Sequence, residues 1–252
     1  MTWILLIIAA ALVIYIVQNI IRHKKLAISD ALAALGIIAA LITASNTFPK
    51  AQNISELPPD KALEVALQWP VIYHDTFDDS GQYWRDTDNK TNELVTVSFD
   101  GIYNILADNK QEKVIREAFY NDKADAPETY LLSMDVVGLK GCDIGLTFRG
   151  SLDSEFYIFS VGRNQYEVAK RTKEDGRKSF FDRRDLTDST KNLRSLQVLA
   201  EKSRYRLYVN KKFVDELNDN TLDGSRVGVE ILVCQDVKEA KFQIDNFKIQ
   251  TP

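Results

Sequence analysis

The sequence has few of the residues from which metal centres and thiol sites are built. Its 252 residues include two cysteines, Cys142 and Cys234, and two histidines, His23 and His74. These four residues lie far apart and form no Cys-x-x-Cys or Cys/His grouping, which excludes a zinc centre of ordinary ligand spacing. The cysteines are expected as buried thiols, as a reactive thiol or, in an oxidising compartment, as a disulfide.

The chain also lacks a surplus of basic residues. It carries 32 Lys and Arg against 36 Asp and Glu, which gives a formal net charge of -4. Residues 1–48 hold three of the basic residues and one of the acidic ones, so 29 basic and 35 acidic residues remain in 49–252. Because binding to nucleic-acid phosphates requires a basic surface, this acidic remainder argues against a nucleic-acid partner.

Charged residues are nearly absent from residues 1–48. Residues 3–21 form a run of nineteen without a charge, and residues 26–44 form a second run of nineteen that contains only Asp30. Each run is long enough to cross the hydrocarbon core of a bilayer as a helix. A cleaved signal peptide is disfavoured, because no basic segment precedes the first run and a second apolar run follows it at once. The pattern predicts a two-span transmembrane hairpin.

The turn between the two runs holds all the basic residues of this region, namely Arg22, Lys24 and Lys25. Basic residues near membrane ends stay on the cytoplasmic side. The turn should therefore face the cytoplasm, and the rest of the chain should be extracytoplasmic, in a periplasm or at a cell surface. The alternative is a re-entrant or interfacial helix over 26–44, which would leave the rest of the chain in the cytoplasm.

Small residues recur at four-residue spacing in the second run, at Gly36, Ala40 and Ala44. Such a face allows helices to pack closely within a membrane. It could join the two helices of the hairpin, or it could dock onto another membrane protein subunit or a second copy of the chain. Asp30 lies close enough to the basic turn to pair with Lys25.

Residues 49–70 are predicted to be a linker with a short helix. The segment is polar and contains Pro49, Pro58 and Pro59, which are typical of a tether. Asp60 can cap a helix over 61–69 that ends before Pro70.

From residue 71 to residue 252 the pattern is that of β-strands. Short runs rich in β-branched and aromatic residues alternate with turn signals such as Asp100-Gly101, Asp175-Gly176 and Asp223-Gly224. No long amphipathic helix separates them, which favours an all-β antiparallel sandwich over a parallel α/β sheet. The expected strands cover 94–99, 130–136, 142–148, 156–161, 166–169, 194–200, 205–209, 226–233 and 242–249.

The order of several segments resembles a known family. These are Tyr73-His74-Asp75-Thr76-Phe77 with Trp84, Gly145-Leu146-Thr147-Phe148-Arg149 before Phe156-Tyr157-Ile158-Phe159, Arg206-Leu207-Tyr208-Val209-Asn210, Gly224-Ser225-Arg226-Val227-Gly228 and Ile244-Asp245-Asn246-Phe247. Over about residues 71–250 the chain resembles the concanavalin A-like lectin/glucanase jelly roll, in the branch with laminin-G-like and 3-keto-disaccharide hydrolase-like domains. The resemblance implies a jelly-roll β-sandwich.

The resemblance also implies candidate site residues. Arg149 and Tyr157 match positions where family members line the concave sheet, so they are candidates for contact with a glycan. The structural calcium of the glucanase relatives would correspond to Asp245, the segment around Asp75, and the carbonyl of Gly101, an oxygen-only set that suits calcium.

The glucanase members carry an acidic Glu-x-Asp-x-(x)-Glu strand, because retaining cleavage needs two carboxyl groups close together. This sequence has no such strand, and neither a nucleophile elbow nor a glycine-rich phosphate loop is present. We therefore expect no enzyme activity.

A basic stretch over 170–184 stands out in the otherwise acidic remainder. It could be a solvated hairpin whose phenylalanines, Phe180 and Phe181, tuck into the sandwich, or a docking patch for an acidic partner, polysaccharide or lipid headgroup. Its basic residues are Lys170, Arg171, Lys173, Arg177, Lys178, Arg183 and Arg184.

Together these patterns predict a membrane-anchored, non-catalytic, extracytoplasmic interaction module that serves as an accessory subunit of a larger membrane complex. A lectin-like module that binds glycan is the first alternative. A glycoside hydrolase-type enzyme is the second.

Overall fold

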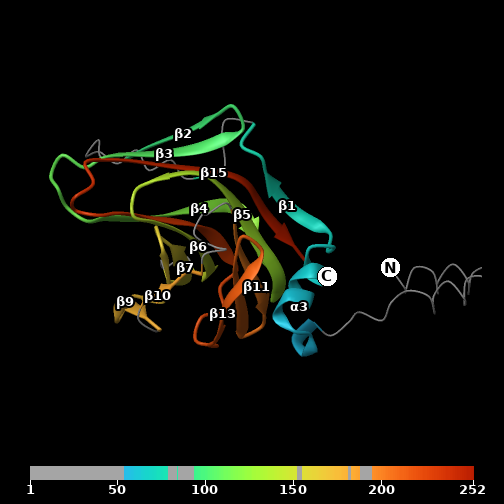
Figure 1. Ribbon diagram of the computed structural model, residues 1–252. Helices are drawn as coiled ribbons and strands as arrows, with labels where there is room; N and C mark the ends of the chain where they lie inside the picture. The colour runs from blue at the N-terminus through green and yellow to red at the C-terminus, as the bar shows by residue number, and fades with distance from the viewer. Residues whose placement is uncertain (1–53, 79–83, 85–93, 152–154, 181–182, 188–194) are drawn as a thin grey trace, which may run out of the picture. The chain divides into compact units, whose positions relative to one another are not determined.

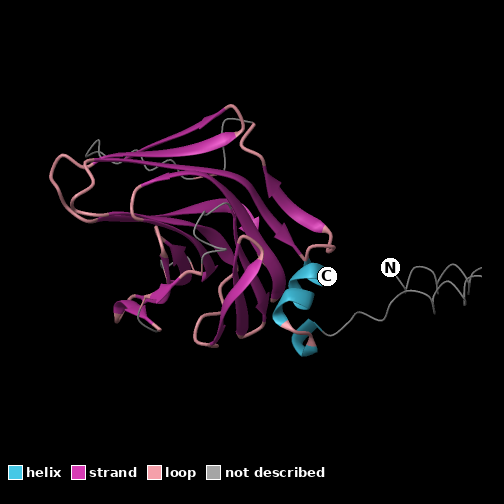
Figure 2. Cartoon of the chain, in the orientation of Figure 1, coloured by secondary structure: helices cyan, strands magenta, loops and turns pink. Residues whose placement is uncertain are grey.

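The computed structural model describes residues 54–252 except 79–83, 85–93, 152–154, 181–182 and 188–194. Most of the described chain is β-strand, with one short α-helix (Figures 1 and 2). The elements are η1 (Ile54–Glu56), α3 (Pro59–Ala66), β1 (Val71–Asp75), β2 (Leu94–Phe99), β3 (Ile102–Asp108), β4 (Ile115–Asp125), β5 (Thr129–Lys140), β6 (Asp143–Gly150), β7 (Phe156–Val161), β8 (Gln165–Thr172), β9 (Gly176–Ser179), β10 (Arg184–Asp185), β11 (Ser195–Glu201), β12 (Arg204–Val209), β13 (Lys212–Asn218), β14 (Arg226–Val233) and β15 (Glu239–Gln250).

The strands form two antiparallel sheets. One sheet has the order β13-β12-β11-β5-β15-β3-β2, with β1 paired to β15, and the other has the order β10-β8-β7-β6-β14-β4, with β9 paired to β8. We call them the eight-stranded and the seven-stranded sheet. Consecutive strands pair in hairpins such as β6–β7 and β11–β12, and β14 and β15 join strands from distant parts of the chain. Every pairing is antiparallel, so the antiparallel sandwich expected from the sequence is confirmed.

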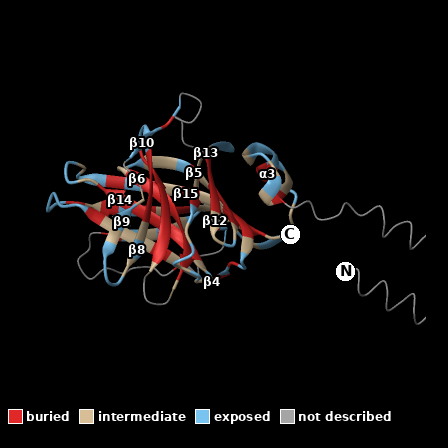
Figure 3. Ribbon diagram, turned by 90° about the horizontal axis from the view of Figure 1, so that it is seen from below, coloured by how far each residue is buried: buried red, intermediate tan, exposed pale blue. Residues whose placement is uncertain are grey.

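The core lies between the two sheets. Along β14 the residues Val227, Val229, Ile231 and Val233 point inward and are fully buried, as the two-residue period of a strand requires. Figure 3 shows the buried residues gathered along the strands and the exposed ones in the connections. Because both inner faces are apolar, any chemistry of this domain has to come from the outer faces or the ends of the sandwich.

The segment before β1 packs on the outer face of the eight-stranded sheet. Ala62, Leu63 and Ala66 of α3 contact the outward side chains of Leu199 and Tyr208. The helix begins at Pro59 and ends at Ala66, earlier than the predicted span of 61–69. Proline suits a first helical position. After Ala66 the α-helical pattern ends, because the N–H groups of Gln68 and Trp69 donate to carbonyl oxygens three residues earlier instead of four.

The described residues contain no helix long and apolar enough to span a membrane. The predicted hairpin helices, 3–21 and 26–44, and the small-residue face of Gly36, Ala40 and Ala44 lie outside the described residues.

Candidate functional site

Two glutamates face each other across the outer side of the seven-stranded sheet. Glu230 of β14 is paired in register with Gly145, Gly145 with Ser160, and Ser160 with Glu167 of β8. The row therefore has carboxylates at its ends and small residues between them. A larger residue at 145 is excluded, because a Cβ there would lie 2.6 Å from the carbonyl oxygen of Phe159.

One guanidinium joins the two carboxylates. Nη1 of Arg177 donates to both oxygens of Glu230 at 3.0 Å, and Nη2 donates to Glu167 at 3.1 Å. Arg177 belongs to β9, four strands from β14 in the sheet order. At about 4.8 Å per strand a flat sheet would separate these strands by about 19 Å, which is too far for the two side chains to span. The sheet must therefore curl, and its outer face is concave at this point.

Further polar groups complete the arrangement, which we call the Glu167–Glu230 site. Arg116 of β4 lies 3.3 Å from Glu230, and Arg183 lies 3.7 Å from Glu167. Ser179 donates a short hydrogen bond to Glu167. The side chains of Glu230 and Glu167 are only 3% and 10% exposed, so water screens these charges weakly.

The two carboxyl groups have pKa values shifted in opposite directions. Burial raises the pKa of Glu230, and this effect outweighs the attraction of Arg177 and Arg116. Burial also acts upward on Glu167, but the hydrogen bond from Ser179 and the charge of Arg177 together hold its pKa below the ordinary value. Two nearby carboxyl groups with separated pKa values can divide between them the work of a proton donor and of an ionised base or nucleophile.

An apolar cluster adjoins this site on the same outer face. Phe156, Ile158 and Ala169 are fully buried there, and the ring of Tyr120 lies edge-on to that of Phe156, with centroids 5.5 Å apart. Within the described part of the chain, the hydroxyls of Tyr120, Thr147 and Ser160 are buried without a hydrogen-bond partner. These features place a buried apolar cluster and unsatisfied hydroxyls beside the carboxylates.

The family-implied glycan residues lie elsewhere. Tyr157 is fully buried between the sheets, where its ring packs on Phe148 and Tyr205, because its strand position points inward. Arg149 is buried at the end of β6 and donates hydrogen bonds to backbone carbonyls. Neither side chain lines the concave face, which corrects that placement.

The basic stretch is largely paired with the domain's own acids. Arg177 binds the two glutamates, Arg183 binds Asp143, and Arg184 binds Asp215. Lys170 lies 3.7 Å from Asp219 and over the ring of Phe180, which packs on the core. Arg171 lies over the ring of Phe156, whereas Lys173 and Lys178 are exposed. The structure therefore has a set of ion pairs where the sequence suggested a solvated basic hairpin.

The calcium candidates are held in separate hydrogen-bond sets. Asp75 accepts hydrogen bonds from Trp84 Nε1 at 2.8 Å and from the backbone N–H of Phe77 at 2.9 Å, Asp245 bonds Asn246, and the Gly101 turn lies against Thr76 and Asp78. The calcium stays a prediction.

Among the described residues, the grouping of acidic and thiol side chains close enough to share an ion is Cys142, Cys234 and Asp236. Its cysteines are joined in a disulfide with a Cα–Cα distance of 5.7 Å.

Sequence reasoning missed Glu167 and Glu230 because they lie on different strands, and a search for one acidic strand does not find them. The signal was a single charged residue inside an apolar strand, as in Val229-Glu230-Ile231. A glutamate buried in that position needs a partner, and Arg177, which the sequence suggested as part of a surface patch, is that partner.

No protein-family profile and no curated protein matches the sequence. Solved structures do share the fold. The catalytic domain of an endo-1,3-β-glucanase (laminarinase) from Thermotoga petrophila RKU-1 is 8% identical, with a TM-score of 0.51, over 73% of this chain and 98% of that chain. A non-specific endo-β-1,3(4)-glucanase from family GH16 is 13% identical, with a TM-score of 0.49, over 73% and 91%. LamAcat from Zobellia galactanivorans is 9% identical, with a TM-score of 0.48, over 72% and 97%.

The chain thus has the concanavalin A-like jelly-roll fold found in glucanase structures. This finding corrects the leading expectation of a non-catalytic accessory module without enzyme activity, because the laminarinase structure that shares the fold is a catalytic domain. At this identity the likeness shows the fold alone, so the activity of this chain is a matter for proposal.

Proposed function

We propose that this protein is a glycoside hydrolase-type enzyme that cleaves a polysaccharide at the Glu167–Glu230 site. The observation that carries the proposal is a pair of buried carboxyl groups on a concave sheet face with pKa values shifted apart. Glu230, whose pKa is raised, is the proton donor to the leaving oxygen. Glu167, whose pKa is lowered, is the ionised partner that acts as nucleophile or base.

Substrate reaches this pair by displacing Arg177. The guanidinium occupies the space between the carboxylates, and it comes from a four-residue strand at the edge of the sheet. A side chain on a short edge strand can turn away without breaking the core. The half-buried ring of Tyr120, which lies edge-on to Phe156 beside the pair, suits the face of a sugar ring.

Hydrolysis of a β-1,3-glucan is the first test, since the laminarinase that shares the fold acts on that class. Release of reducing ends by the full chain is expected, with a loss of about 10²–10⁴-fold in Glu230→Gln and in Glu167→Gln. Glu239→Gln is the matched control, because that glutamate is exposed and remote on β15. Equal activity in all four proteins, or no turnover of any of a panel of glycans by the wild type, would contradict the proposal.

We infer in addition that residues 3–21 and 26–44 form a transmembrane hairpin and that the β-sandwich is extracytoplasmic. The two apolar runs and the basic turn of Arg22, Lys24 and Lys25 support this. The Cys142–Cys234 disulfide supports it independently, because disulfides persist in oxidising compartments. A polysaccharide substrate would be met in such a compartment.

A further inference from the structure

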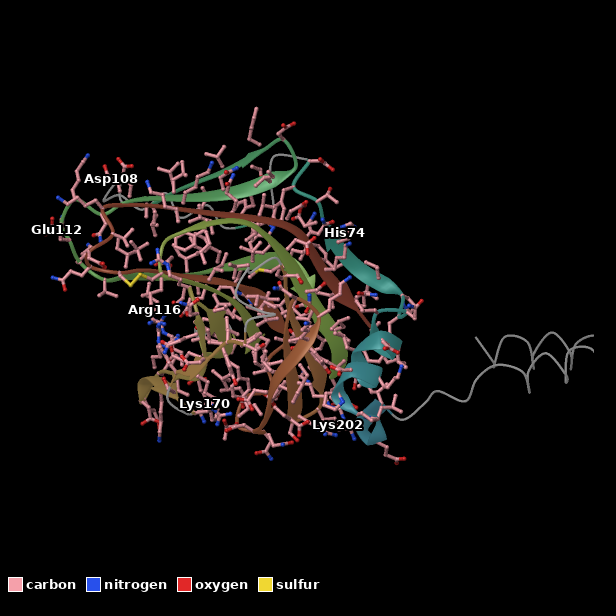
Figure 4. The ribbon with its side chains drawn as sticks, viewed as in Figure 1. His74, Asp108, Glu112, Arg116, Lys170 and Lys202 are labelled. Carbon is pink, nitrogen blue, oxygen red and sulfur yellow. A yellow bond between two sulfur atoms is a disulfide. The ribbon has the colours of Figure 1, made fainter. Side chains whose placement is uncertain are left out.

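A pocket of about 470 Å³ opens at one end of the sandwich, away from the Glu167–Glu230 site. Three connections surround it: the β4–β5 loop, the β11–β12 turn and the β13–β14 loop. Figure 4 labels Lys202 at this pocket and Arg116 at the carboxylate pair, and the two lie well apart in that view. Its volume lies in the range of pockets that hold small molecules.

Arg149 forms the floor of this pocket and ties two of its walls together. The side chain is buried, and its guanidinium donates to the carbonyl oxygens of Pro127 at 3.1 Å, Glu128 at 2.5 Å and Lys202 at 3.0 Å. The guanidinium carbon lies over the rings of Tyr130 and Tyr205, 5.3 and 5.9 Å from their centroids. The β4–β5 loop and the β11–β12 turn are therefore fixed to one rigid cation.

The third wall, the β13–β14 loop, is also fixed by hydrogen bonds. Asp219 accepts hydrogen bonds from the hydroxyl of Tyr157 and from the backbone N–H of Thr221, and the N–H of Leu222 donates to the same tyrosine at 3.1 Å. Gly224 brings the loop close to β6, since a Cβ there would lie 2.0 Å from the carbonyl oxygen of Gly150. The pocket is thus formed before any ligand binds, which lowers the entropic cost of binding.

The lining offers both kinds of hydrogen-bonding group. Lys202, Ser203 and Asn220 supply donors, whereas the carboxylates of Glu128 and Asp223 supply acceptors. With two carboxylates and two basic groups the lining has no net formal charge, so it favours neither an anion nor a cation. A neutral ligand that both donates and accepts satisfies all of them, and hydroxyl groups do both.

Apolar surface is present as well. Tyr205 and Leu222 line the pocket beside these polar groups. Tyr205 is fully buried in the pocket wall, whereas Leu222 is partly exposed. A sugar residue combines hydroxyls at its rim with an apolar C–H face, and the Leu222 side chain suits such a face.

We propose that this pocket is a second glycan site, separate from the carboxylate pair, which binds one neutral sugar residue at the end of a polysaccharide chain. The second site and the Glu167–Glu230 site share only the class of ligand, a glycan. The pocket holds the polymer without cleaving it. Arg149 is a positioning residue here, since it fixes the loops that carry the binding groups.

The test uses saturation-transfer NMR on the full chain, with D-glucose and with laminaritriose as probes. Asp223→Ala removes an exposed acceptor from the rim, and Ser203→Trp fills the space. At least one probe should bind the wild type, and each substitution should weaken that binding by tenfold or more. Asp236→Ala is the matched control, because Asp236 is an exposed aspartate in a different pocket. Melting temperatures equal to the wild type would show that the variants are folded.

The outcomes separate this site from the proposed active site. Retained binding in Glu167→Gln and Glu230→Gln, with loss in Asp223→Ala, supports the second site whether or not the protein hydrolyses glucan. Binding that is lost in the glutamate variants and kept in Asp223→Ala and Ser203→Trp would overturn it, and so would a wild type that binds neither probe.

Discussion

Glu230 illustrates how a buried charge is tolerated at the scale of a residue. It lies in β14 between Val229 and Ile231, with its side chain 3% exposed, and removal of such a group from water is costly unless it is paired. Arg177 and Arg116 supply that pairing from two other strands. The two arginines hold the Glu230 carboxyl group where little water reaches it, and this burial raises the pKa of Glu230.

The pKa of Glu167 is shifted in the opposite direction, and the effect of this shift on stability can be tested. Its pKa is lowered in the folded protein, so it stabilises the fold above the ordinary value of 4.5, and this stabilisation is lost as the pH falls through the lower native value. Glu167→Gln should lower the melting temperature most above about pH 5, and the difference from the wild type should shrink below pH 4.5. A difference that stays constant or grows toward acid would refute this assignment, and Glu239→Gln should show little difference at any pH.

At the scale of elements, α3 and η1 depend on a buried arginine. Arg206 of β12 is fully buried, and Nη1 and Nη2 donate to the carbonyl oxygens of Ile54 and Ser55 at 3.0 Å. Glu216 lies 3.4 Å from Nε of the same side chain. These bonds, with the packing of Leu63, fasten the segment before β1 to the sheet.

Arg206→Met should therefore loosen this segment. The substitution leaves the Ile54 carbonyl without its donor, whereas Arg204 still donates to the Ser55 carbonyl at 2.6 Å and pairs with Glu216 at 2.7 Å. The free energy of unfolding should therefore fall by about 1–3 kcal/mol, the cost of an unsatisfied buried polar group. Urea unfolding measures the loss, and hydrogen exchange should quicken first in Ile54–Ala66. Lys211→Met, on the neighbouring turn and exposed, is the control. Unchanged exchange in α3 would show that the helix is held by its apolar contacts alone.

The elements were more predictable than the site, for a physical reason. β2 and β14 have the bounds expected from the sequence, because their alternation of β-branched residues is a local signal. β4 was not expected, since Ile115–Asp125 mixes charged residues into its alternation. The meeting of Glu167, Glu230 and Arg177 depends on strand order and on sheet curl, and no local pattern encodes either of them.

At the scale of the whole molecule, the orientation in the membrane is open to a direct measurement. A single cysteine at Ser45 should react with a membrane-impermeant thiol reagent on intact cells, and one at His23 should not, because the basic turn faces the cytoplasm. Cys142 and Cys234 can stay in place, since a disulfide does not react, and their removal would cost about 2–5 kcal/mol. Labelling at residue 23 and not at residue 45 would reverse the topology.

The pairing of β1 with β15 has a mechanical consequence. Val71 lies opposite Gln250, so the chain enters and leaves the sandwich at the same end of this strand pair. A pull between the two ends would peel the strands apart one hydrogen bond at a time, which is the weak direction of a β-ladder. The segment before β1 carries such a load first, because Ile54 and Ser55 are bound to Arg206 on β12. Tension arriving from residue 53 is thus borne by β12, the neighbour of the edge strand β13, before it reaches the seam between the first and last strands.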